Sequence, residues 1–145
     1  EKAPEQLAFG DWVPQGLPFY TGNIIYQCPV TVKKEISDAV LEIPHFSAPV
    51  LVVHLDGIRK GVLAFAPHRL CLGRLAEGRH RIDITAYGNR FNAFGTLHNA
   101  NEEYLWYGPD SYRTRGSQWT DSYLLHEMGI RTTPVLYERK KNPEE

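Results

Sequence analysis

The stretch that decides the fold runs from residue 50 to residue 89 and reads VLVVHLDGIRKGVLAFAPHRLCLGRLAEGRHRIDITAYGN. Its first part is rich in β-branched and apolar residues and is interrupted by Asp56-Gly57. Asp-Gly between two apolar runs is typical of a two-residue hairpin turn, because both central positions of a type I′ turn need a positive φ. We therefore predict a hairpin with one strand at 50–55 and its return strand at about 58–65.

A further strand is predicted at 79–87, where polar and apolar residues alternate. This period of two is typical of a strand with one buried face and one solvated face. One predicted face carries His80, Ile82, Ile84 and Ala86, and the other carries Arg81, Asp83, Thr85 and Tyr87. The whole stretch therefore predicts antiparallel β structure with one face on a core.

The remaining strands are predicted on both sides of this stretch. Residues 23–34 alternate in the same way, and Pro29, which has no N–H, places that strand at a sheet edge or a bulge. Two more strands are expected at 119–128 and 134–139. No segment shows a convincing helical periodicity, so we predict an all-β fold, a β-sandwich of two antiparallel sheets with about seven to nine strands.

Length and composition limit the function classes. The chain has 145 residues, of which 42% are hydrophobic and 23% charged, which is enough for one domain with its own core. The formal net charge of −1 gives no basic excess for nucleic acid, and no apolar run approaches the ~20 residues that cross a bilayer. We therefore expect no nucleic-acid partner and no membrane span.

The chain ends and their surroundings give a provisional domain plan. We predict an irregular N-terminal segment at 1–22 that packs on the sandwich, the β-sandwich domain at 23–139 and a charged tail at 140–145. Phe19 and Tyr20 are the expected anchors of the N-terminal segment. The chain begins without methionine, which indicates a processed or excised fragment, and the extracellular, periplasmic and cytoplasmic compartments all stay open.

Cysteines and histidines give no predicted metal site. Cys28 and Cys71 lie in strand-like runs and are expected to be buried small side chains rather than a disulfide. His54 and His80 could face each other across paired strands, but two histidines without a third ligand do not make a zinc site. No cofactor is predicted, and a structural calcium stays open because sequence does not show carbonyl ligands.

The best candidate for function is a long aromatic loop. Residues 90–123 hold eight of the seventeen aromatic residues, interleaved with Gly, Asn, Ser and Asp. Loops of this length are often functional, and a sugar site needs aromatic platforms beside planar polar groups. The candidate carbohydrate-binding residues are His98, Tyr104, Trp106, Tyr107, Arg113 and Trp119. The alternatives are that these aromatics close the open end of the sandwich or contact a neighbouring domain, and that His98 only orders its own loop.

Residues 50–89 also resemble a known family. The order of strand, Asp56-Gly57, return strand, Pro67 and the run Leu-x-x-Gly-x-His-x-Ile-x-Ile is similar to the galactose-binding-domain-like jelly roll. Such modules are attached to many glycoside hydrolases, and the sugar-binding domain of the family-2 enzymes is one of them. Asp56 and His80 stand at positions where Asn is commoner in that pattern. The resemblance implies a jelly-roll β-sandwich for most of the chain.

The resemblance implies an accessory role rather than catalysis. A glycosidase needs a pair of carboxyl groups, but Glu102 and Glu103 are adjacent, while Asp110 and Asp121 lie in turn-rich contexts. We therefore expect a non-catalytic module of a larger glycoside hydrolase, which braces the catalytic domain and contributes to carbohydrate binding. Its partners would be carbohydrate or the adjacent catalytic domain. The alternatives are an autonomous carbohydrate-binding module that uses loop 98–119 and a protein-interaction domain.

Overall fold

The chain folds into antiparallel strands with very little helix. The structure is a computed structural model that describes residues 4–101 and 108–140. Its strands are β1 (Ile24–Val32), β2 (Ile36–Glu42), β3 (Phe46–Ser47), β4 (Leu51–Leu55), β5 (Ile58–Leu63), β6 (Arg69–Leu75), β7 (Gly78–Ala86), β8 (Gly129–Ile130) and β9 (Val135–Glu138). One short helix, α1 (Phe91–Phe94), and one 3-10 turn, Pro109–Ser111, complete the described elements. The prediction of an all-β fold is confirmed.

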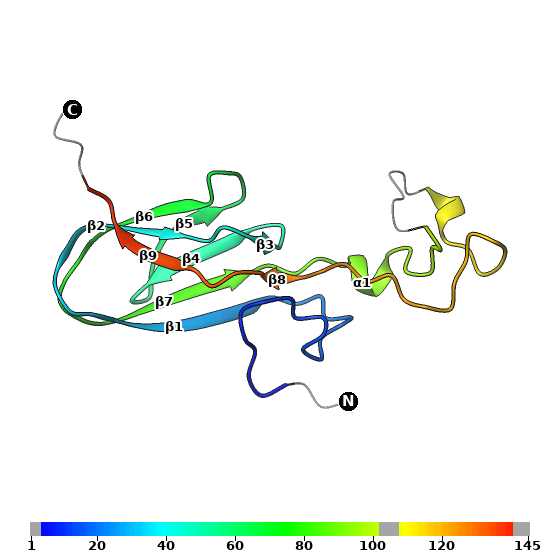
Figure 1. Cartoon of the computed structure of the whole chain (residues 1–145), viewed down its shortest axis with the longest axis horizontal. Coiled ribbons are helices and arrows are strands. Elements are labelled where there is room, and N and C mark those ends of the chain that lie inside the picture. Colours follow the sequence, from blue (N-terminus) through cyan, green and yellow to red (C-terminus); the bar gives the residue numbers. More distant parts are fainter. Residues whose placement is uncertain (1–3, 102–107, 141–145) are drawn as a thin grey trace.

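Two larger sheets pack face to face and enclose the core. One has the strand order β1-β7-β4-β5, the other has the order β6-β2-β9, and β3 pairs with β8 in a small separate ladder (Figure 1). Val53 and Ile84 from the first sheet and Leu41 and Leu72 from the second are all fully buried in one cluster. The described residues therefore form the predicted β-sandwich.

The predicted hairpin is confirmed, and the strand predicted at 79–87, which is β7, lies in the interior of its sheet. Asp56 and Gly57 have φ values of 50° and 82°, so both adopt the left-handed conformation that the turn requires. β7 pairs with β1 on one side and with β4 on the other. Ile82, Ile84 and Ala86 are buried, as the alternation predicted.

β1 is an edge strand, as the proline predicted. It pairs only with β7 among the described strands, and Pro29 lies opposite Arg81 in that ladder. Along the strand, Tyr26 and Val32 are buried while Ile25 is exposed, which follows the predicted alternation. A proline, which lacks the N–H, disturbs a sheet least in an edge strand, because that strand forms hydrogen bonds to a neighbour on one side only.

The strand predicted at 119–128 is wrong. Regular pairing begins only at β8, and the residues before it are irregular. Side chains form hydrogen bonds with backbone N–H groups that a strand ladder would need. Asn92 Oδ1 accepts from His126 N–H at 2.9 Å, and Asp11 Oδ1 accepts from Met128 N–H at 2.9 Å. Such side-chain to backbone bonds compete with sheet formation. The other predicted strand, at 134–139, is confirmed by β9.

The expected anchors of the N-terminal segment are also wrong. Phe19 and Tyr20 are 44% and 40% exposed, whereas Trp12 is only 1% exposed and belongs to the core. Gly10 N–H donates to Ile130 O at 2.7 Å and Trp12 N–H donates to Met128 O at 3.0 Å. The segment is thus fixed by one buried indole and by backbone bonds beside β8.

Two predictions about polar and sulfur side chains need correction. Cys28 and Cys71 are both free thiols, but Cys71 is exposed and donates to Asp38 Oδ1 at 3.2 Å. Leu72, the next residue along β6, takes the inward position instead. His54 lies opposite Asp83 in the β4–β7 register and therefore does not face His80.

His80 instead links the Asp56-Gly57 turn to the turn between β6 and β7. Its Nδ1 lies 2.7 Å from Asp56 Oδ2 and its Nε2 lies 2.9 Å from Ala76 O. Both partners are acceptors, so only the doubly protonated imidazolium can donate to both at once. Asp56 Oδ1 also accepts from Arg81 N–H at 2.8 Å. Asp56 and His80, the two positions that depart from the family pattern, therefore contact each other.

This contact shifts the pKa values of both side chains. The hydrogen bond to Asp56 raises the pKa of His80, and the Ala76 carbonyl adds to the shift. The hydrogen bond from His80 lowers the pKa of Asp56, and the Arg81 N–H acts in the same direction. A raised histidine pKa stabilises the fold fully below the ordinary value of 6.5, and that contribution is lost as the pH rises through the raised value.

We therefore predict that the free energy of unfolding falls by about 1 kcal/mol or less above pH 6.5 because of His80, since the pair is partly solvated. His80→Gln should remove this part of the pH dependence. Chemical denaturation at a series of pH values measures it. The exposed His45 is the control, and His45→Gln should keep the wild-type slope. An unchanged slope in His80→Gln would contradict the assignment.

Candidate functional site

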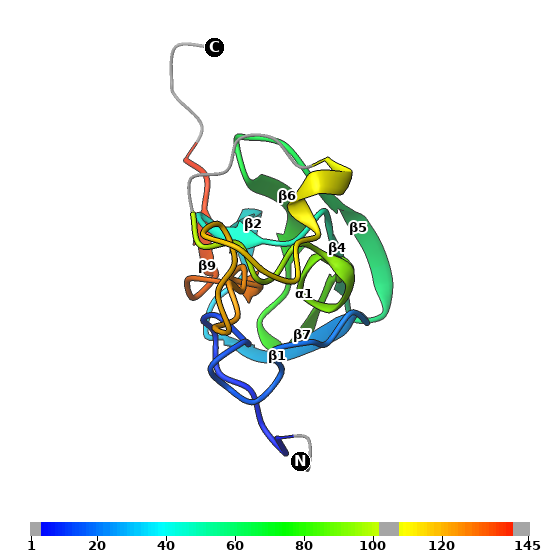
Figure 2. The same ribbon diagram turned by 90° about the vertical axis from the view of Figure 1, so that its right-hand side faces the viewer.

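The aromatic loop forms one end of the molecule. Beyond Ala86, the chain leaves the sheet, passes through α1 and returns only at β8. This segment extends past the ends of the strands (Figure 1), and Figure 2 shows the same end facing the viewer. We call residues 87–101 and 108–127 the loop end. Its backbone is held by a few specific hydrogen bonds rather than by a sheet.

Asn92 joins the two arms of the loop end. It is buried in α1, its Oδ1 accepts from His126 N–H at 2.9 Å, and its Nδ2 donates to His126 O at 2.7 Å. The carboxamide thus pairs with one residue much as a neighbouring strand would. The ring of Phe91 also packs on the ring of His126, with centroids 4.0 Å apart. These contacts fix where the outgoing and returning chains separate.

Further out, the two arms form an irregular antiparallel ribbon. Thr120 N–H donates to His98 O at 2.9 Å, and Ala100 N–H donates to Gln118 O at 3.0 Å. An isolated bridge between Asn99 and Trp119 lies within the same ribbon. This pairing brings residues about twenty positions apart in the sequence into contact.

His98 is the centre of a ring cluster in this ribbon. Its Nδ1 lies 2.9 Å from Thr120 O, and because a carbonyl only accepts, Nδ1 carries the proton. The ring lies 5.9 Å from Trp119 in a stacked arrangement and 4.7 Å from Tyr123. Tyr123 in turn meets Phe19 edge to face at 5.1 Å. His98 therefore ties the ribbon together and supports exposed aromatic rings.

The predicted site residues have different outcomes. His98 and Trp119 are brought together, while Arg113 pairs with Asp110 at 3.4 Å within the 3-10 turn region. The other three candidates, Tyr104, Trp106 and Tyr107, lie outside the described residues.

Two members of the cluster, Tyr123 and Phe19, are not among the predicted site residues. Tyr123 follows Trp119 by four residues and lies within the predicted aromatic loop. Phe19 comes from the N-terminal segment, and its contact with Tyr123 spans most of the chain. No local pattern in the sequence could have indicated that contact.

Many aromatic side chains near this end are exposed. Tyr112 is 63% exposed, and its hydroxyl donates to Phe94 O at 3.3 Å, which keeps the two residues together. The exposed aromatic side chains of the loop end and the adjoining N-terminal segment are Phe19, Tyr20, Tyr87, Phe94, Tyr112 and Tyr123. We call these six the exposed aromatic set. Such a concentration of aromatic surface is typical of a place where a protein meets a partner or a ligand.

A small pocket lies within the ribbon. It has a volume of about 230 Å³ and is lined by Asn99, Ala100, Thr120, Ser122, Tyr123 and Leu124. Every one of these side chains is uncharged. Tyr123 also belongs to the ring cluster, so the His98 ring contacts one residue of the pocket lining.

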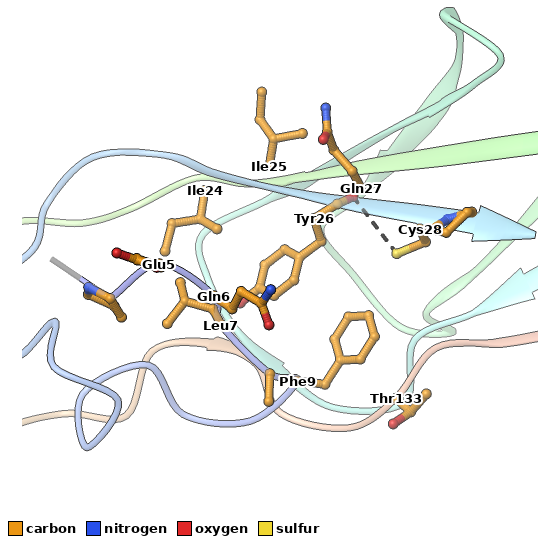
Figure 3. A pocket seen from close by; sticks show the side chains of 13 residues that line it. Glu5, Gln6, Leu7, Phe9, Ile24, Ile25, Tyr26, Gln27, Cys28 and Thr133 are labelled. Carbon is orange, nitrogen blue, oxygen red and sulfur yellow. Dashed lines mark hydrogen bonds between the residues drawn. The ribbon is translucent and has the colours of Figure 1, made fainter.

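A larger groove runs along the outer edge of β1 and is shown in Figure 3. Its volume is about 1060 Å³, and its walls come from the N-terminal segment and from β1. Phe9 stacks on Tyr26 at 5.4 Å inside it, and burial raises the pKa of the Tyr26 hydroxyl. Cys28 is also half-buried there, and burial raises the pKa of its thiol. No pattern in the sequence predicts this groove.

Nowhere in residues 4–101 and 108–140 do three or more His, Cys, Asp or Glu side chains come together as a metal site. Within the same ranges, no helix has the length and apolarity needed to cross a membrane.

Comparisons with known proteins show the fold. No protein-family model matches this chain, and no curated protein matches it. Among solved structures, a rhamnosidase from Novosphingobium sp. PP1Y aligns with a TM-score of 0.58 and 19% identity over 81% of this chain. A GH2 β-galacturonidase from Eisenbergiella tayi bound to glycerol aligns with a TM-score of 0.53 and 24% identity over 89% of this chain. The same enzyme bound to galacturonate aligns with a TM-score of 0.53 and 22% identity over 89% of this chain.

These matches cover only a small part of the other proteins. The chain spans 11% of the rhamnosidase chain and 19% of the β-galacturonidase chain. The fold described here is therefore one that occurs as a segment of glycoside hydrolases.

We predict that Asn92→Ala destabilises the fold by about 2 kcal/mol, because it leaves the backbone N–H and C=O of His126 without their partner. Thermal or chemical unfolding monitored by circular dichroism measures the change. Gln118→Ala removes an exposed amide from the same loop end and should change stability by no more than about 0.5 kcal/mol. Equal effects of the two substitutions would show that Asn92 does not hold the arms.

Proposed function

We propose that this chain is a non-catalytic β-sandwich module of a larger glycoside hydrolase, which braces the catalytic domain and contributes to carbohydrate binding. The observation that supports this most is the coverage of the structural matches. The fold accounts for 81–89% of this chain but for only 11–19% of the enzymes that contain it. A segment of that size has the scale of one domain beside others.

The exposed aromatic set supports a contact surface at the loop end. Aromatic residues are enriched where proteins bind one another, and they also form the apolar platforms on which sugar rings lie. Tyr112 and Tyr123 are 63% and 57% exposed, so more than half of each side chain is open to a partner. We propose that the neighbouring catalytic domain covers part of this surface.

The described carboxyl groups favour an accessory role over catalysis. A glycosidase needs a general acid with a raised pKa beside a second carboxylate. Asp56 and Glu138 have lowered pKa values, the opposite direction, and both form hydrogen bonds within the scaffold. In the loop end, Asp110 pairs with Arg113. Glu102 and Glu103 lie outside the described residues.

The candidate carbohydrate-binding residues are part of this proposal. His98 and Trp119 would support the carbohydrate contact from within the ring cluster, and Arg113 would lie on the same loop end. Tyr104, Trp106 and Tyr107 stay proposed as carbohydrate-binding residues. The division into a segment at 1–22, a sandwich at 23–139 and a tail at 140–145 is likewise proposed, with the segment fixed on the sandwich through Trp12.

Two experiments test the proposal. Sequencing the surrounding gene should show that the reading frame continues into a glycoside hydrolase catalytic domain. In that longer protein, the double substitution Phe94→Ser and Tyr112→Ser should lower the melting temperature of the catalytic domain or weaken its contact with this module. Both side chains are exposed here, so the module's own fold should be kept.

Ile58→Ser is the matched control. Ile58 is exposed, but it follows the Asp56-Gly57 turn at the end of the sheet opposite to α1. It should leave the catalytic domain unchanged. A reading frame that encodes no catalytic domain would refute the proposal, and equal effects of the control and the loop-end variant would refute the assigned surface.

A further inference from the structure

We propose that a pocket at one edge of the sandwich binds a single small, uncharged and apolar molecule of about the size of benzene. The pocket has a volume of about 180 Å³, and its lining comes from β1, β2, β7, β9, the residues just before β9 and the N-terminal segment. We call it the edge pocket. Its described lining includes no residue of the loop end, so a ligand there is independent of the proposed accessory role.

The edge pocket exists because the sandwich is less well closed at one edge than at the other. At the closed edge, β5 contacts β6, and their inward residues Leu63 and Leu75 are buried. At the other edge, the outer strands are β1 and β9. Their inward residues Cys28, Val30 and Leu136 are only half-buried, although all three pack against the core. Apolar surface is therefore left open between the two sheets at this edge.

Buried core residues form the floor of the edge pocket, and the N-terminal segment borders its mouth. Leu41, Ile82 and Ile84 line it and are almost completely buried, so a ligand would touch mainly the half-buried side chains of the two edge strands. Phe9 and Cys28 line both the edge pocket and the groove along β1 (Figure 3). A small molecule can therefore reach the edge pocket from the groove.

The lining offers little to a polar ligand. Among the described lining residues, no side chain carries a charge, and only Cys28 and Thr133 have side chains that can form hydrogen bonds. The Cys28 thiol already donates a weak hydrogen bond to Tyr26 O, at 3.8 Å. A bound water normally has about two to four polar partners, so water in the edge pocket is poorly held and an apolar molecule displaces it readily.

The volume of the edge pocket sets the size of the ligand. Apolar cavities of ~150 Å³ in other proteins bind benzene or xenon. At about 180 Å³, the edge pocket suits one six-membered ring or a branched group of similar size. A polar ring of the same shape would give up its hydrogen bonds to water and recover few of them, which weakens binding.

Two titrations of the 145-residue chain, followed by NMR chemical shifts, test the class of ligand. Benzene should bind with a Kd of about 1 mM and should shift the resonances of Cys28, Val30 and Leu136. Pyrazine has the shape of benzene but carries two ring nitrogens that accept hydrogen bonds from water. It should bind at least about tenfold more weakly.

The two free thiols test the position of the ligand in the unaltered chain. Cys28 lines the edge pocket, whereas Cys71 is exposed on the other sheet. Benzene at about five times its Kd should slow the alkylation of Cys28 by iodoacetamide by up to about sixfold, as mass action requires when the ligand covers the thiol. The rate at Cys71 should stay unchanged and serves as the internal control.

Cys28→Phe is the variant that fills the edge pocket, and Cys71→Phe is its matched control. A ring at position 28 would occupy the space that benzene takes, so benzene binding should be lost. Cys71 is exposed on β6 and does not line the edge pocket, so its substitution should change the Kd for benzene by less than twofold. The alkylation experiment needs no substitution and therefore decides the question even if Cys28→Phe does not fold.

Three results would overturn the inference. The first is that benzene does not bind up to its solubility in water. The second is that pyrazine binds as tightly as benzene, which would contradict the apolar class of ligand. The third is that benzene binds without protecting Cys28 from alkylation, which would place the ligand elsewhere. None of these results would affect the proposed accessory role, which the reading frame and the Phe94 and Tyr112 variants decide separately.

Discussion

The structure depends on the hydrogen-bonded ladders that hold β7 between β1 and β4. A strand paired on both sides has its backbone groups satisfied, so its side chains alone decide which face is buried. In β7 they do so without ambiguity, because Ile82, Ile84 and Ala86 are buried and the residues between them are more polar. A shift of one residue would reverse the faces, and this register therefore fixes the neighbouring strands as well. It also fixes the point at which the chain leaves the sheet and enters the loop end.

The fold could be predicted wherever local chemistry and tertiary structure agree. The Asp56-Gly57 turn, the alternation of β7 and the edge position indicated by Pro29 are all local signals, and each matches the structure. The wrong strand at 119–128 has a clear cause. The segment before β8 has strand-like composition, but Asn92 and Asp11 occupy its backbone groups from distant parts of the chain. Composition does not reveal which distant side chain will take a backbone donor.

The contacts within the candidate site could be predicted only in part. The density of aromatics after β7 predicts a site at the loop end, and the structure joins two of the predicted residues, His98 and Trp119. The pocket, however, is made by a ribbon that pairs residues near 99 with residues near 120. That pairing is set by backbone bonds between irregular segments, for which no periodicity exists to be read. The same holds for the contact between Phe19 and Tyr123.

The two outer strands of the larger sheet have a consequence for how this molecule can associate. An exposed strand edge is a template for another chain, and unprotected edges lead to aggregation. On β1 the template is interrupted by Pro29, and β5 carries the adjacent exposed cations Arg59 and Lys60. Neither strand can easily accept a long, uninterrupted ladder from a second copy. The larger sheet therefore favours association through side chains over extension of its ladders, and this limits edge-to-edge aggregation of the free module.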